Sequence, residues 1–231
     1  MSRGLGDVYK RQALSTGQPA RQCESSTGVA AEEPIMPRRR ATSYDIKLGH
    51  IRDTAAGMFA RDGFTRTSMA ELAGACGVSK ALLYHYFDSK EALLFDILKV
   101  YLNDLETAIT IDPALAASPR DHLRDLIWAL LQQYREAGNT HKLLTFELTV
   151  LNEERQVELR NAERRIVALF SSALDEAAKA AGSETPLDGP RTMMLFGTLN
   201  WTYTWFRDDG YLSLEEYCEI VADSTIASLK T

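Results

Sequence analysis

The chain has few of the residues that hold together small disulfide-bonded or metal-bound proteins. Its three cysteines, Cys23, Cys76 and Cys218, are far apart and form no CxxC pair. An odd number of separated cysteines argues against a disulfide framework and against a zinc site, and it fits a reducing compartment. We therefore expect a cytoplasmic protein with no metal and no other cofactor.

Long apolar runs and catalytic patterns are also missing. No stretch approaches the roughly 18 residues that a transmembrane helix needs, so we expect no membrane partner. No metal-spaced His/Glu pair, nucleophile elbow or glycine-rich phosphate loop occurs. The four histidines fall on different expected helices and lack an acidic partner at ligand spacing. These absences argue against an enzyme.

The residues that are present suit a globular chain with an uneven charge. The composition is 45% hydrophobic and 25% charged over 231 residues. This length and composition allow one large domain or two small ones that fold without disulfide bonds or metal sites. Residues 36–103 hold ten Lys/Arg against seven Asp/Glu (+3), and residues 104–231 hold twelve against twenty-one (−9). A basic front segment on an acidic body is compatible with binding DNA by one end.

Residues 1–42 are expected to form a disordered tail. Residues 1–35 show no apolar periodicity, are rich in Gly, Ser, Gln and Ala, and lack the apolar core of a secretory signal. The stretch DVYKRQ, residues 7–12, resembles a translated sequencing adapter, so we interpret part of the tail as a gene-assembly artefact with Met36 as the start. A native tail is the alternative. The run 38–40, RRR, is either a solvated basic segment or an arm for the minor groove.

From residue 43 onward the apolar spacing is helical, and no segment shows a convincing strand alternation. We expect an all-α chain of about nine helices. A first helix ends near Gly63, two short ones follow, and a longer one runs from Ser89 to about Ile109. The remaining helices are expected at about 119–137, 140–152, 154–181, 190–207 and 213–229. Residues 43–100 would form an amino-terminal three-helix domain, and residues 101–231 a larger helical bundle.

The segment SMAELAGACGVSKALLYHYF, residues 68–87, predicts a helix-turn-helix. Ala73 is small where two helices must cross closely, and Gly77 supplies the turn, where a positive φ is cheap only for glycine. Ser79 stands at an N-cap position, so the second helix presents its first turn outward. In a helix-turn-helix this first turn enters the major groove of DNA.

Residues 63–94, GFTRTSMAELAGACGVSKALLYHYFDSKEALL, resemble the signature of the TetR family. The resemblance implies a ligand-responsive regulator, usually a repressor. Such a protein binds a near-palindromic operator in double-stranded DNA as a homodimer, and a small-molecule effector binds its carboxy-terminal bundle. By position, Thr67 and Ser68 would hold phosphate and Lys90 would anchor the next helix to phosphate. The set that would face the duplex is Ser79, Lys80, Ala81, Leu82, Tyr84 and His85.

Some of these positions keep an alternative interpretation. Leu82 departs from the Thr of many relatives, and an apolar contact with a thymine methyl is the alternative to a polar contact there. Tyr84 could be a core aromatic and His85 a solvated surface residue. Tyr86 is interpreted as core. A helical adaptor that binds only protein is the runner-up for the whole chain, although it leaves residues 68–87 unexplained.

Residues 190–207, PRTMMLFGTLNWTYTWFR, predict a helix that is apolar on nearly all sides. Such a helix needs a second partner surface. The family resemblance implies that it forms a four-helix bundle with helix 213–229 and the same two helices of another subunit. Burial in a monomer is the alternative. The expected interface residues are Leu195, Leu199, Trp201, Leu214, Tyr217 and Val221.

The last forty or so residues also resemble TetR-family members that respond to acyl-coenzyme A thioesters. Such an effector needs an apolar tunnel and cations for its phosphates. The expected tunnel residues are Tyr101, Trp128, Tyr134, Phe146, Phe170 and Trp201, with charge from Arg160, Arg164 and Arg165. Alternatively, these arginines pair with Glu158 and Glu163 along a solvated face. The helix that begins at Ser89 is the only long element expected to carry an effector signal to the DNA-binding end.

Overall fold

Every regular element in the described residues is helical. The computed structural model describes residues 43–183 and 189–229, so the tail expected over 1–42 lies outside it. The described residues contain nine α-helices of seven residues or more, one four-residue helix and two short 3-10 helices, and no strand. The all-α expectation is therefore confirmed. None of the helices in these residues combines the length and apolarity needed to span a membrane.

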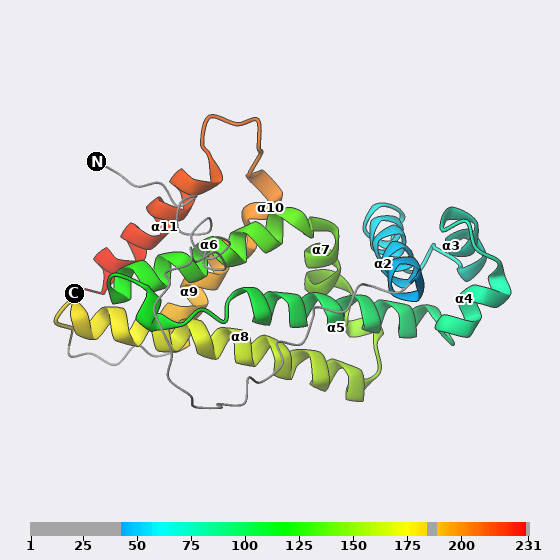
Figure 1. The fold of residues 1–231 in the computed structure, drawn as a ribbon, viewed down its shortest axis with the longest axis horizontal. Coiled ribbons are helices and arrows are strands. Elements are labelled where there is room, and N and C mark those ends of the chain that lie inside the picture. The colour runs from blue at the N-terminus through cyan, green and yellow to red at the C-terminus, as the bar shows by residue number, and fades with distance from the viewer. Residues whose placement is uncertain (1–42, 184–188, 230–231) are drawn as a thin grey trace, which may run out of the picture. The chain divides into compact units, whose positions relative to one another are not determined.

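The first three helices lie together at one end of α5 (Figure 1). They are α2 (Ser43–Asp62), α3 (Met69–Ala75) and α4 (Lys80–Tyr86), and α5 covers Lys90–Ala108. Gly63, with a φ of 90°, follows the end of α2, and Gly77, with a φ of 65°, stands in the turn between α3 and α4. These values are strained for residues with a Cβ atom, which explains glycine at both turns. Phe59, Leu72 and Leu83 are at most 1% exposed and form the shared core.

Three helices form the middle of the molecule. They are α6 (Pro119–Glu136), α7 (Gly138–Glu147) and α8 (Glu153–Ala180), with 3-10 turns at Pro113–Leu115 and Leu148–Val150. Helix α5 packs along α8, and α6 packs on both (Figure 1). Helix α7 packs on α2 as well as on α5 and α6. The amino-terminal three-helix end is therefore connected to the rest of the molecule by α7 as well as by α5.

The expected helix 190–207 is broken at Trp201, and this part of the expectation was wrong. The structure has α9 (Gly189–Asn200) and then the one-turn α10 (Thr202–Trp205), followed by α11 (Leu214–Ser228). The Thr202 hydroxyl donates to the Leu199 carbonyl at 2.6 Å and the Thr204 hydroxyl to the Trp201 carbonyl at 2.7 Å. Threonine hydroxyls that bond nearby carbonyls compete with the regular helical ladder. The apolar pattern does not record this competition.

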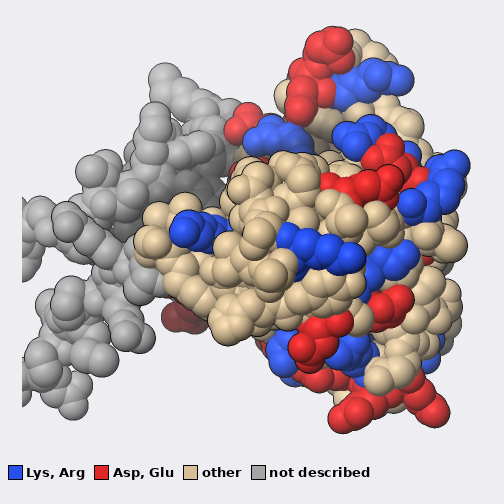
Figure 2. All heavy atoms as spheres, turned by 90° about the vertical axis from the view of Figure 1, so that its right-hand side faces the viewer, with Lys and Arg blue, Asp and Glu red and all other residues tan. Residues whose placement is uncertain are grey.

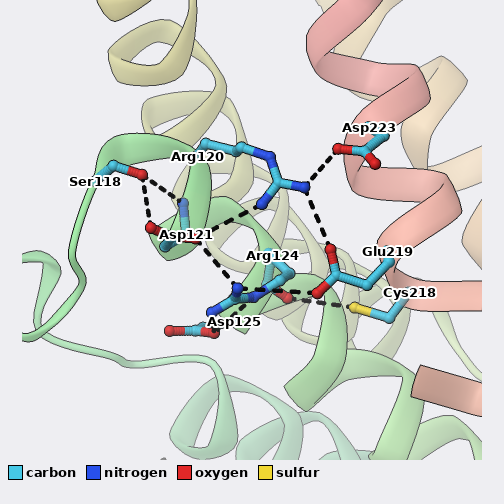
Figure 3. Close-up of polar contacts among 8 residues, drawn as sticks. All are labelled: Ser118, Arg120, Asp121, Arg124, Asp125, Cys218, Glu219 and Asp223. Carbon is cyan, nitrogen blue, oxygen red and sulfur yellow. Dashed lines mark hydrogen bonds and ion pairs between the residues drawn. The ribbon is translucent and has the colours of Figure 1, made fainter. Parts of the chain in front are cut away.

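A cluster of ion pairs joins α6 to α11 (Figure 3). Arg120 of α6 pairs with both Glu219, at 3.2 Å, and Asp223 of α11. One turn further along α6, Arg124 lies 3.1 Å from Asp121 and 3.8 Å from Glu219. The hydrogen bond to Asp223, followed by the one to Glu219, holds the pKa of Arg120 above its usual value despite partial burial. These pairs join the first two turns of α6 to the middle of α11.

Candidate nucleic-acid interface

Ser68 and Glu71 cap the first motif helix reciprocally. The Ser68 hydroxyl accepts from the Glu71 amide at 3.2 Å, and the Ser68 amide and hydroxyl both donate to the Glu71 carboxylate at 2.8 Å. These bonds, the one from the Ser68 amide first, hold the pKa of the Glu71 carboxyl below its usual value. The arrangement is a capping box, which sets where α3 begins. The Ser68 groups expected at phosphate are thus already bonded to Glu71.

Helix α4 presents four of the expected residues on one exposed face. Ser79 caps the helix by accepting from the Leu82 amide at 3.1 Å. Lys80, Ala81, Tyr84 and His85 are exposed on the following two turns, whereas Leu83 is fully buried on the opposite side. The Lys80 ammonium lies 5.8 Å from the centre of the Tyr84 ring. Leu82 is half-buried at the edge of this face.

Thr67 does not have the geometry expected of a phosphate contact. Its side chain is buried, with 3% exposure, and its hydroxyl donates to the Gly63 carbonyl at 3.0 Å. The hydroxyl therefore stabilises the turn that leads into α3. A residue just before a helix N-terminus can face inward or outward, and only the tertiary packing decides which.

Lys90 also differs from its expected role. Its ammonium donates to the Phe64 carbonyl at 2.8 Å and to the Thr65 carbonyl at 3.3 Å, and lies 4.5 Å from the centre of the Phe64 ring. The side chain is half-buried. The ammonium is thus engaged inside the protein, and the expected phosphate anchor has no support in this geometry.

Two further exposed residues of the amino-terminal helices were not predicted from the sequence. Tyr44 of α2 is 52% exposed and lies edge-to-face on Tyr86 with a centroid distance of 5.2 Å, which leaves Tyr86 half-buried. Arg66 is exposed in the turn before α3, with its Nε bonded to the Asp62 carbonyl at 2.6 Å. Viewed from this end, Lys and Arg side chains form a band between acidic side chains above and below (Figure 2). In the sequence, the basic residue Arg66 within GFTRTS was the feature that could have indicated a DNA contact at this turn.

The carboxy-terminal half contains a cavity of about 450 Å³. It is lined by residues from the end of α6, the start of α7, and α10 with the loop that follows it. Of the expected tunnel residues only Tyr134 lines it. Its hydroxyl donates to the Asn200 side chain at 2.7 Å, and its ring stacks on His141 at 3.9 Å. Burial lowers the pKa of His141 to about 4 and raises that of Tyr134. The other lining residues are Leu131, Arg135, Gly138, Asn139, Lys142, Thr202, Tyr203, Phe206, Asp208 and Leu214.

The other residues expected at a tunnel lie elsewhere, so that set requires correction. Tyr101, Trp128 and Phe170 are 5%, 8% and 0% exposed and belong to the packed core. Phe146 is 57% exposed, on the outside of the molecule. Arg165 makes a two-pronged pair with Glu106, at 2.7 and 2.8 Å, and thus pairs with neither Glu158 nor Glu163. Periodicity identifies apolar positions but does not separate a filled core from a lined cavity.

The expected dimer residues are mostly buried within the single chain. Leu199 is fully buried, and four others are at most 7% exposed: Leu195, Leu214, Tyr217 and Val221. Trp201 alone of that set is exposed, at 61%. The opposite side of the same helices carries the exposed apolar residues Met193, Met194, Trp201, Trp205 and Ile220. A helix that is apolar all round has two such faces, and the sequence did not show which one turns inward.

A helix-turn-helix with an exposed second helix, attached to a separate helical body, defines a DNA-binding regulator. Comparison with known families agrees. Residues 51–97 match the model described as bacterial regulatory proteins of the tetR family, and residues 116–229 match the tetracyclin repressor-like carboxy-terminal domain. The chain belongs to the TetR family of transcriptional regulators, and neither the family nor its relatives are enzymes.

Related proteins support the same assignment. A TetR-family regulator from Bordetella parapertussis 12822 is 31% identical, covers 77% of this chain and 93% of its own, and has a TM-score of 0.70. The repressor KstR2 of Rhodococcus jostii strain RHA1 is 24% identical over 75% of this chain and 88% of its own. AibR, solved with isovaleryl coenzyme A and operator DNA, is 26% identical, covers 79% of this chain and 97% of its own, and has a TM-score of 0.64.

Proposed function

We propose that this protein is a repressor that binds a near-palindromic operator as a dimer and leaves it when a small effector binds. The observation that carries the proposal is the exposed face of α4. Lys80, Ala81, Tyr84 and His85 lie together there, on a helix whose other side is anchored by fully buried Leu83. A rigid helix with a cation, an aromatic and an imidazole on one face suits the major groove. The protein would act in the cytoplasm, where bacterial DNA lies.

The dimer would form through the exposed side of α9, α10 and α11. Met194, Trp201, Trp205 and Ile220 are between 43% and 71% exposed there. A groove of about 560 Å³ runs between α9 and α11, with Met194, Trp201 and Trp205 among its lining residues. Large apolar side chains gathered on one face favour a protein partner over solvent. A second copy meets this need, since the same face of the partner is equally apolar.

The effector would bind in the cavity beside Tyr134. Leu131, Phe206 and Leu214 give this space an apolar wall. Arg135 and Lys142 place two cations at it, and Asp208 of the same lining pairs with Arg135 at 3.9 Å. A ligand with an apolar tail and phosphate groups matches both features. We therefore propose an acyl-coenzyme A thioester, the class of ligand with which the related AibR was solved.

The same cavity lies close to the joint with the DNA-binding end. Helix α7 starts at Gly138, and the cavity touches Gly138, Asn139 and Lys142. Lys142 also reaches the Ala60 carbonyl of α2 at 3.5 Å. A ligand that displaced the start of α7 would therefore press on α2 directly. We propose this second route beside the α5 helix named from the sequence.

The proposal is tested by selecting operator sequences from random duplexes and measuring binding by fluorescence anisotropy. Wild type should enrich a near-palindromic site and should release it when an acyl-coenzyme A of medium chain length is added. Coenzyme A alone is the control for the acyl part. A protein that enriches no sequence, and binds random duplex no better than an acidic globular protein does, would favour the adaptor alternative.

A further inference from the structure

Lys90 joins the two ends of the helix-turn-helix. It is the first residue of α5, directly after the turn that leaves α4. Its two carbonyl partners, Phe64 and Thr65, lie in the turn between α2 and α3, 26 and 25 residues earlier. The segment between these contacts contains all of α3 and α4. One ammonium group therefore ties the turn through which the chain enters this unit to the helix through which it leaves.

The position of this lysine needs a compensating partner. The first turn of a helix carries the positive end of the helix dipole, which disfavours a cation. The Ala92 amide in that turn is satisfied by the Ser89 hydroxyl at 3.1 Å, which also offers no charge to the lysine. The ammonium turns back to two carbonyl oxygens and to the Phe64 ring, 4.5 Å away. Carbonyl oxygens and the face of an aromatic ring both attract a cation.

The partner side of the contact is firmly held. Phe64 is 4% exposed and its ring lies 5.0 Å from the ring of fully buried Phe59 in α2. The Phe64 carbonyl also accepts from the Thr67 amide at 3.3 Å. The Thr67 hydroxyl closes the same turn by bonding Gly63. The lysine therefore contacts an ordered turn that is packed on the core.

We propose that Lys90 is a positioning residue, which clamps α3 and α4 to the first turn of α5 so that the helix-turn-helix moves with α5 as one block. Where DNA is concerned, this inference rests on the proposed function. It differs from the phosphate anchor that the family resemblance implies for this position. The two roles predict different dependences of DNA binding on salt, because each lysine at a phosphate releases a counterion when DNA binds.

The first experiment compares Lys90→Met with the matched control Lys80→Met on a random-sequence duplex at several salt concentrations. Methionine keeps an apolar stem and removes the charge. Lys80 is exposed on the proposed DNA face of α4. On a random duplex, where no base is selected, we expect its ammonium to pair with phosphate, so its loss should flatten the plot of log affinity against log salt by about 0.9 per subunit. Lys90→Met should weaken binding and leave the slope as in wild type. A slope flattened as much as in Lys80→Met would overturn the clamp in favour of the phosphate anchor.

The second experiment needs no DNA. Amide hydrogen exchange of the free protein should quicken about tenfold over residues 63–68 in Lys90→Met, since charge-assisted hydrogen bonds that hold this turn are lost. Lys90→Arg retains the donors and should keep most of the protection, and Lys80→Met should change nothing there. Unchanged exchange in Lys90→Met would overturn the clamp.

These two measurements separate the clamp from the proposed function. If wild type shows no salt-dependent DNA binding, the proposed function fails, while the exchange experiment still decides the clamp. If Lys90→Met does not fold, Lys90→Gln replaces it, because its amide can still donate to one carbonyl. Its exchange over residues 63–68 should then be faster than in wild type, by less than the roughly tenfold expected when both carbonyl contacts are lost. Exchange at the wild-type rate in Lys90→Gln would count against the clamp.

Discussion

Trp201 and Leu199 are two residues apart, yet replacing them should have opposite consequences. Trp201 is 61% exposed and Leu199 is fully buried in the single chain. Trp201→Ser should weaken the proposed dimer and leave the folded subunit almost as stable as before. Leu199→Ala should instead lower the stability of the subunit by about 2–5 kcal/mol, as for other leucines removed from a core.

The size of the Trp201 effect follows from its exposure. A tryptophan can bury about 250 Å², so an exposed fraction of 61% leaves about 150 Å² to cover. At about 25 cal/mol per Å², this area is worth about 4 kcal/mol per subunit at most. If half of this free energy is gained when the dimer forms, the two tryptophans together contribute about 4 kcal/mol. Losing both in Trp201→Ser should then raise the dissociation constant of the dimer about a thousandfold.

Sedimentation velocity over a dilution series measures this constant, and thermal unfolding at a fixed high concentration measures subunit stability. Trp201→Ser should dissociate at concentrations where wild type and Tyr211→Ser remain dimeric. Tyr211 is 97% exposed on the loop before α11 and is the matched aromatic control. An undiminished dimer in Trp201→Ser would refute the interface. A loss of subunit stability as large as that of Leu199→Ala would refute the burial argument.

Three further predictions concern the DNA face, the cavity and its buried histidine. Tyr84→Ala should weaken binding to a selected operator by about 1–3 kcal/mol more than binding to random duplex, and equal losses in anisotropy titrations would contradict a role in sequence recognition. Lys142→Ala should weaken acyl-coenzyme A binding more than binding of the dephosphorylated thioester in calorimetry, and equal losses would place the phosphates elsewhere. Burial lowers the pKa of His141 from 6.5 to about 4. Between these pH values the unfolded chain therefore binds a proton that the folded chain does not. The free energy of unfolding should fall as the pH drops through this window, by about 3 kcal/mol at most. Urea unfolding of His141→Phe should show a flatter pH profile there, and an unchanged profile would mean that another group titrates.

Local sequence signals predicted the helix-turn-helix closely. Ser79 and Ser89 cap the helices that follow them, and Gly77 has the positive φ that the turn required, whereas Ser68, which we expected at phosphate, is a helix cap instead. These features depend on neighbours within about four residues, so a single sequence can reveal them. The exposed side of α4 follows from the same local pattern, once Leu83 is assigned to the core.

Features that depend on distant residues were not predictable in this way. Lys90 meets carbonyls 25 and 26 residues earlier, and Arg165 meets Glu106 across 59 residues. Nothing in the spacing near either residue records these partners. Which of the two apolar faces of α9 is buried also depends on distant residues, because α8 and α11 cover one face and leave the other exposed.

The ion pairs between α6 and α11 have a consequence for the spacing of DNA half-sites. Arg120 pairs with Glu219 and Asp223, and Arg124 lies near Glu219 (Figure 3). Sliding α11 along α6 by one turn would carry its exposed residues about 5.4 Å, which exceeds the rise of about 3.4 Å per base pair. In a dimer built on α9–α11, such a slide would alter the separation of the two α4 helices by a comparable distance. The contact between α6 and α11, although far from the α4 helices, would therefore bear on the operator spacing that the proposed dimer accepts.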